Sequence, residues 1–70
     1  MPRIVEQLPD GTVVTLSRDG VAVCASVMSR DREKIERVVT LLSREFQASF
    51  FQPVCVSGEW ATFGRITSRQ

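Results

Sequence analysis

The stretch Thr12–Met28, TVVTLSRDGVAVCASVM, decides the fold, because it reads as two β-strands joined by a tight turn. Asp19-Gly20 separates two runs of β-branched and aliphatic residues, and Asp-Gly in that place favours a two-residue type I′ turn. Such a turn pairs Leu16 with Val23. Because side chains alternate along a strand, one face of this hairpin is then aliphatic and the other is small and half polar. The sequence therefore predicts a sheet that buries one face.

A helix is expected directly after the hairpin, from about residue 30 to residue 47. Ser29 offers a side-chain oxygen as the N-cap, and Asp31 and Glu33 place acids in the first turn, where the helix dipole favours them. Apolar residues then recur at steps of three and four and form one stripe, namely Ile35, Val38, Val39, Leu42 and Phe46. This stripe is expected to pack on the aliphatic face of the sheet.

Further strands are predicted on both sides of this unit. RIVEQL, the weakest of them, precedes Pro9-Asp10-Gly11, whose proline and glycine favour a turn. After the helix, SFFQPVCV and EWATFGRIT flank a two-residue turn at Ser57-Gly58. Proline cannot donate a hydrogen bond to its neighbour, so the strand containing the proline of SFFQPVCV is expected at a sheet edge or to begin late.

These elements predict an α+β fold in a single domain, residues 1–70: a small antiparallel sheet of about five strands in the chain order β-β-β-α-β-β, with one amphipathic helix packed on one face. Which strands are neighbours in the sheet stays open. At this length a single core yields only about 3–5 kcal/mol without staples or oligomerisation. No stretch approaches the ~20 apolar residues of a membrane span, and the N-terminus lacks a signal peptide's apolar core. We expect a soluble cytoplasmic protein that does not contact membranes.

The side chains that catalysis or metal binding would require are missing from the sequence. The chain has no His and no Tyr, and its eight carboxylates are scattered over turns and the helix surface. No glycine-rich phosphate loop is present. Cys24 and Cys55 lack the spacing of a zinc site, and we expect both to be small buried hydrophobes rather than a disulfide. The sequence therefore predicts no enzymatic activity, no cofactor and no metal.

Arginines recur at seven-residue intervals through the expected helix. Arg30, Arg37 and Arg44 lie opposite the apolar stripe, with Lys34 beside them, and such a row suits phosphates or the carboxylates of a protein. Glu33 and its acidic neighbours dilute the charge, so a merely solvated helix face is the alternative. The net charge of +1 argues against a nucleic-acid binder that relies on bulk positive charge.

The second predicted hairpin is apolar on both faces. If its strands pair in one continuous register, Phe51, Trp60 and Ile66 share one face, whereas Phe50 and Phe63 share the other. One helix covers only one side of a small sheet, so the Phe51–Trp60–Ile66 face is a candidate docking surface. The alternative is that Trp60 packs beneath the helix and the Phe50 face points outward. One apolar face stays uncovered in either case.

Together these features favour a small non-enzymatic interaction protein, an inhibitor or adaptor that binds and blocks a macromolecular partner. Its candidate contacts are Arg30, Lys34, Arg37, Arg44, Phe51, Trp60 and Ile66. In size and make-up the chain is similar to the compact inhibitors that bacteriophages and other mobile elements encode against host machinery, anti-CRISPR proteins among them. No motif carries this similarity, so it indicates no family.

The expected partner is another protein or protein complex, with a homodimer as a further candidate. The runner-up function is a nucleic-acid-binding module that uses the arginine face, doubled in a dimer. A structural subunit of a larger assembly is a third interpretation, and the sequence does not separate it from the first. Salt dependence would separate the nucleic-acid interpretation from the other two, because phosphate contacts weaken steeply as salt rises.

Overall fold

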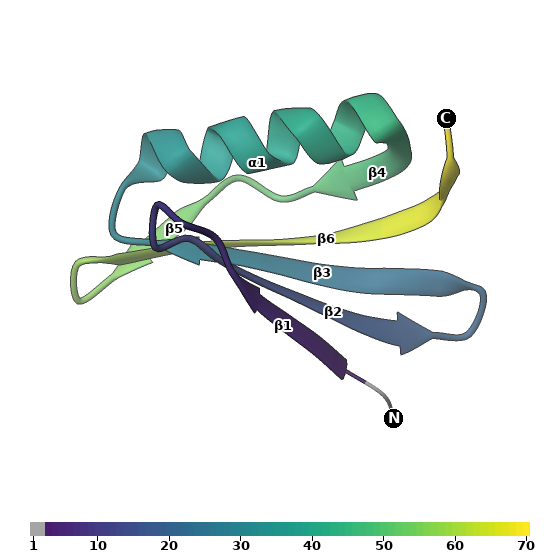
Figure 1. The fold of residues 1–70 in the computed structure, drawn as a ribbon, viewed down its shortest axis with the longest axis horizontal. Helices are drawn as coiled ribbons and strands as arrows, with labels where there is room; N and C mark the ends of the chain where they lie inside the picture. Colours follow the sequence, from purple (N-terminus) through teal and green to yellow (C-terminus); the bar gives the residue numbers. More distant parts are fainter. Residues whose placement is uncertain (1–2) are drawn as a thin grey trace.

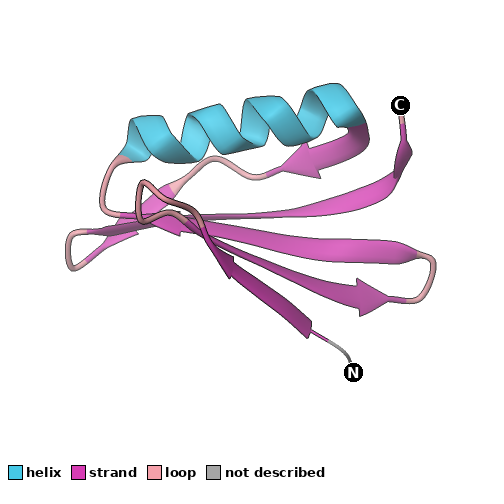
Figure 2. Cartoon of the chain, in the orientation of Figure 1, coloured by secondary structure: helices cyan, strands magenta, loops and turns pink. Residues whose placement is uncertain are grey.

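The sheet is antiparallel, and one helix packs on one of its faces, as the sequence predicts (Figures 1 and 2). The computed structural model describes residues 3–70. Its elements in chain order are β1 (Arg3–Gln7), β2 (Val13–Asp19), β3 (Ala22–Ser29), α1 (Arg32–Glu45), β4 (Phe46–Phe50), β5 (Val54–Val56) and β6 (Glu59–Arg69). The strand order is β1-β2-β3-β6-β4, and β5 also pairs with β6. The described residues hold six strands rather than about five, because the fourth predicted strand is split in two.

The β2–β3 hairpin keeps its predicted faces, but its turn lies one residue later in the chain. Leu16 lies opposite Ala25, and the two loop residues are Gly20 and Val21. Of these two, only Gly20 has a positive φ, 64°, which is the pattern of a type II′ turn. The predicted type I′ turn is wrong, because it would also have forced Asp19 to a positive φ. The pairing shifts by two residues in consequence, and a shift of two leaves every side chain on its original face.

The helix begins two residues later than expected and ends two residues earlier. Its N-cap is Asp31, whose Oδ1 accepts a hydrogen bond from the Glu33 N–H at 2.9 Å. The predicted cap, Ser29, instead accepts a hydrogen bond at its Oγ from the Asp31 N–H at 3.0 Å, so it supports the cap from outside the helix. At the other end Phe46 is already extended, with φ −134° and ψ 157°, so the helix ends at Glu45.

The C-terminal end of α1 is held by the end of β6. The last carbonyls of a helix have no partner within it and need donors from elsewhere. The main-chain N–H of Gln70 donates to the Glu45 carbonyl at 2.9 Å, and its side-chain Nε2 donates to the Ser43 carbonyl at 3.0 Å. The Arg69 guanidinium lies 5.4 Å from the centre of the Phe46 ring, within the range of a cation–π contact. The helix is therefore anchored to the sheet at this end.

The hydrophobic core lies between α1 and the sheet. Its buried centre is Val27 of β3 with Ile35 and Val38 of the helix. Six partly buried residues pack around this centre, namely Leu8, Val14, Val39, Leu42, Phe50 and Trp60. The predicted apolar stripe is thus confirmed for its first four members, whereas Phe46 belongs to β4 rather than to the helix.

The pairing of β4 and β5 with β6 places Phe50 and Phe51 on the opposite faces from those predicted. Both strands pair with the same edge of β6, but the β4–β6 register shifts by one residue between Gln47 and Ala48, so residues 48–50 and β5 differ in register by one. The register shifts back at 51–53, where Pro53 interrupts the hydrogen bonding, and β5 begins only at Val54, at the sheet edge as predicted. The expectation of one continuous register was therefore wrong. Phe50 pairs with Gly64 on the helix side, whereas Phe51 points to the other face.

Gly64 leaves the room that the Phe50 ring occupies. A Cβ at this position would lie 2.5 Å from Phe50 Cδ1 and 2.5 Å from the main-chain oxygen of Ser49. Cβ atoms in proteins essentially never come that close to another heavy atom. The aromatic ring covers the strand glycine, an arrangement that compensates for the missing side chain. Glycine is needed here for its size rather than for its backbone freedom.

Candidate interaction surfaces

The face of the sheet opposite α1, here called the open face, is covered by no other element of the described chain (Figure 1). Side chains on paired residues share a face, so the strand registers give its composition. At its centre lies an apolar band, defined as Val13, Met28, Phe51, Val54, Ala61 and Phe63. The exposed fractions are 78% for Phe51, 54% for Phe63 and 41% for Met28. The band is therefore an apolar surface in contact with water.

A shallow hollow of about 360 Å³ lies at one side of this band. Phe51 and Phe63 form its apolar wall, and Cys24, Ser49 and Arg65 also line it. Phenylalanine and arginine are both enriched in the buried core of protein interfaces relative to the rest of the surface. The hollow is therefore the part of the open face best suited to receive an apolar side chain.

Charged residues of β6 flank the apolar band at both of its ends. Arg30 and Glu59 form an ion pair at 3.7 Å at one end, and Arg65 and Asp19 form another at 3.4 Å at the other end. All four side chains are largely exposed, so each pair contributes about 0–1 kcal/mol at most. On the open face of β6 the order is thus acidic, apolar, apolar, basic.

The predicted Phe51–Trp60–Ile66 surface is not formed. Trp60 and Ile66 lie on the helix side of the sheet, and only 9% of Ile66 is exposed. Trp60 packs against the core, and the Arg32 guanidinium lies 5.3 Å from its ring centre. Phe51 lies on the open face, because the register changes at 51–53. The alternative in which Trp60 packs beneath the helix describes the structure, although Phe50 also lies on that side.

The predicted arginine row is only partly on the helix. Arg30 precedes the helix, in the segment that leads into it. Arg37 lies 3.8 Å from Glu33 in an i,i+4 pair, and Arg44 lies in the last turn, where the helix dipole favours a positive charge. Sequence reasoning missed Leu41, which is 57% exposed between Arg37 and Arg44 and lines a wide depression of about 670 Å³. The outer helix surface is therefore mixed rather than simply basic.

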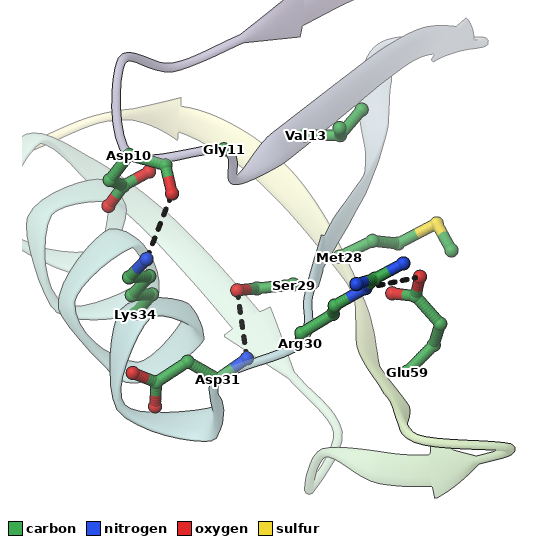
Figure 3. A pocket seen from close by; sticks show the side chains of 9 residues that line it. All are labelled: Asp10, Gly11, Val13, Met28, Ser29, Arg30, Asp31, Lys34 and Glu59. Carbon is green, nitrogen blue, oxygen red and sulfur yellow. Dashed lines mark hydrogen bonds and ion pairs between the residues drawn. The ribbon is translucent and has the colours of Figure 1, made fainter.

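Lys34 lines a pocket of about 440 Å³ at the N-terminal end of the helix (Figure 3). Val13 and Met28 of the apolar band also line this pocket, so it adjoins the band. Its Nζ donates to the main-chain oxygen of Asp10 at 2.9 Å, so it is engaged in tying the helix to the β1–β2 loop. The Asp10 carboxylate accepts a hydrogen bond from the Thr12 main-chain N–H, which lowers the pKa of Asp10 below its ordinary value of 3.8. Most polar groups of this pocket bond to one another, so their main role is to stabilise the fold.

The two cysteines lie on opposite faces of the sheet and are both unpaired. Cys24 is half-buried on the open face, and Cys55 is exposed, so the expectation that both are buried was wrong. Their position on opposite faces excludes a disulfide between them within one folded chain. Among residues 3–70, no group of three or more His, Cys, Asp or Glu side chains could hold a metal ion.

Within that same part of the chain, no helix has the length and apolar character needed to cross a membrane. No family model matches this chain, and no curated protein or solved structure matches it either.

Proposed function

We propose that this protein is a non-enzymatic interaction module that binds another protein in the cytoplasm and blocks or bridges it. The observation that carries the proposal is the apolar band on the open face. Soluble proteins rarely leave large contiguous apolar surfaces exposed unless a partner covers them.

The composition of the open face supports a protein partner. Phe51 and Phe63 expose apolar area, and burying such area against a partner stabilises the complex by roughly 25 cal/mol per Å². Arg65 and Glu59, with their ion-pair partners, form a polar margin around the band, the arrangement of a protein interface with an apolar centre. Inhibitors of the compact type that mobile elements encode remain the functional class that the size and make-up favour.

The nucleic-acid alternative gains little support from the outer helix surface. Arg37 is paired with Glu33 and Arg32 with Glu36, so the arginines share this surface with acids. A phosphate backbone would meet those acids as well as the bases, and the attraction would be weakened. Nucleic-acid binding therefore enters as one outcome of the test below.

The test is a tagged pull-down from lysate of the host cells in which the protein acts, with and without nuclease treatment. Three single variants are compared with the wild type: Phe63→Glu on the open face, Leu41→Glu on the outer helix surface, and Val21→Glu as the control. Val21 is 98% exposed at the tip of the β2–β3 turn, away from both surfaces.

We expect a protein partner that resists nuclease, is lost with Phe63→Glu and is kept with Val21→Glu. Loss of the partner after nuclease treatment, with binding that weakens steeply as salt rises, would replace the proposal with nucleic-acid binding. A wild-type protein that captures nothing above the level of the tag alone would contradict both functions.

A further inference from the structure

We propose that the first occupant of the open face is a second copy of this chain, packed sheet against sheet. The inference rests on the proposed function, since it names a partner for the same adhesive surface. The two sheets would be related by a two-fold axis that lies between them and runs perpendicular to the strands, at the level of Thr62. Symmetric pairing of one patch with itself is the commonest form of protein oligomer.

Charge complementarity along β6 supports this arrangement. Glu59, Ala61, Phe63 and Arg65 follow one another at two-residue steps on the open face, symmetrically about position 62. In the proposed dimer, Glu59 of one copy lies opposite Arg65 of the other, and the symmetry makes this contact twice. Glu59 and Arg65, each of which also has an ion-pair partner in its own chain, thus meet an opposite charge in the second copy, whereas stacking with the strands parallel would place Glu59 over Glu59 and Arg65 over Arg65.

The sizes of the facing side chains are complementary as well. The same symmetry places Phe63 opposite Ala61 of the second copy, because both lie on β6 one step from the axis. Met28 pairs with Ala61, and Ser26 pairs with Phe63, so Met28 of one copy likewise faces Ser26 of the other. Large side chains opposite small ones allow two sheets about 10 Å apart to interdigitate.

The hollow beside the apolar band also receives a side chain in this dimer. Val54 pairs with Ala61, and Phe51 lies beside Phe63, so the two-fold axis places Val54 of the second copy over Phe51. Val54 is exposed in the single chain. The second copy thus fills the hollow with an apolar group.

The thin core of the single chain gives a thermodynamic reason for self-association. Among residues 3–70 the buried hydrophobic residues are Ala22, Ala25, Val27, Ile35, Val38 and Ile66, and two of these six are alanines. Domains of this size commonly depend on staples or on oligomerisation for stability. Stacking two open faces creates a second core between the sheets and leaves both helices on the outside, where the surface around Leu41 stays free.

The test measures molar mass by light scattering during size-exclusion chromatography of the full chain. We expect twice the chain mass of 7.8 kDa for the wild type and a single chain mass for Phe63→Glu. Leu41→Glu is the matched control, because Leu41 and Phe63 are exposed to similar extents, 57% and 54%, and it should leave the dimer intact. Circular dichroism of Phe63→Glu tests whether the monomeric variant is still folded.

A charge exchange tests the orientation of the two copies. Glu59→Arg or Arg65→Glu alone should weaken the dimer, with a Kd roughly tenfold higher, because each creates two like-charge contacts. The double variant Glu59→Arg/Arg65→Glu should bring the Kd back toward the wild-type value, because it restores both contacts between the copies, while the new like-charge neighbours Arg30 and Asp19 are present in the free chain as well as in the dimer. Failure of the double variant to recover would overturn the proposed antiparallel stacking.

A wild-type chain of single mass at high concentration, or a Phe63→Glu variant that remains a dimer, would overturn the proposal. If the wild-type chain is a monomer but still captures a protein from lysate, and Phe63→Glu abolishes the capture, self-association fails while the proposed function stands. If it captures nothing, both fail.

Discussion

Replacing Gly64 with alanine should destabilise the fold, although the backbone at this position accepts any residue. The added methyl group would lie 2.5 Å from the Ser49 carbonyl oxygen, which is fixed by the pairing of β4 with β6, and 2.5 Å from Phe50 Cδ1. Overpacking of this kind costs about 1–3 kcal/mol in the free energy of unfolding. That cost outweighs the roughly 0.4–1 kcal/mol that Gly→Ala replacement gains by restricting the unfolded chain.

The assay is urea unfolding followed by the fluorescence of Trp60, the single tryptophan, at one fixed protein concentration. After the opposing gain is subtracted the net loss is about 1–2 kcal/mol, so with a slope of about 1 kcal/mol per M for a small protein the midpoint should fall by roughly 1–2 M. In a Phe50→Leu background the cost of Gly64→Ala should shrink by about 1 kcal/mol, because the shorter side chain yields more easily. A midpoint for Gly64→Ala at or above that of the wild type would refute the steric reasoning.

Three further changes probe the core, the cap and the β1–β2 loop. Ile35→Ala should cost about 2–5 kcal/mol, close to the whole stability of the domain, and should abolish the thermal unfolding transition seen by circular dichroism. Asp31→Ala should cost about 1 kcal/mol and lower the melting temperature more than Ser29→Ala, because only Asp31 caps the helix directly. Because the pKa of Asp10 is lowered in the folded protein, its carboxylate contributes fully to stability above pH 3.8, and this contribution is lost as the pH falls through the lowered pKa. Asp10→Asn keeps an acceptor for the Thr12 N–H but does not titrate. Melting temperatures measured over a series of acidic pH values should therefore fall less steeply for this variant than for the wild type.

The parts of the fold that the sequence predicted are those with strong local signals. Ser57 and Gly58 both take positive φ, 51° and 79°, and form the predicted two-residue turn. The three- and four-residue spacing of the helix stripe is likewise a local pattern, and Ile35 and Val38 are buried as expected. In both cases the residues that decide the structure are close together in the sequence.

The predictions that failed depend on a choice between nearby alternatives. Gly20 serves equally in a turn with Asp19 or with Val21, and the backbone energy of one residue decides between them. Phe50 and Phe51 exchange faces because the register shifts by one residue between Gln47 and Ala48 and shifts back at 51–53, beside Pro53. Nothing in the local sequence pattern marks these two shifts. The candidate surface therefore moved from Trp60 to Phe63, although the expectation of one uncovered apolar face was right.

The central position of β6 has a consequence for how the chain folds. It pairs with β3 on one side and with β4 and β5 on the other, yet it follows all of them in the sequence. During synthesis the inner edge of β3 stays without a neighbour until β6 leaves the ribosome, while the helix segment already has an apolar stripe to bury. Contacts between such distant segments slow folding, and an unpaired strand edge invites aggregation. The first hairpin and the helix can form early, but the protein becomes a single cooperative unit only when this strand inserts between them and β4.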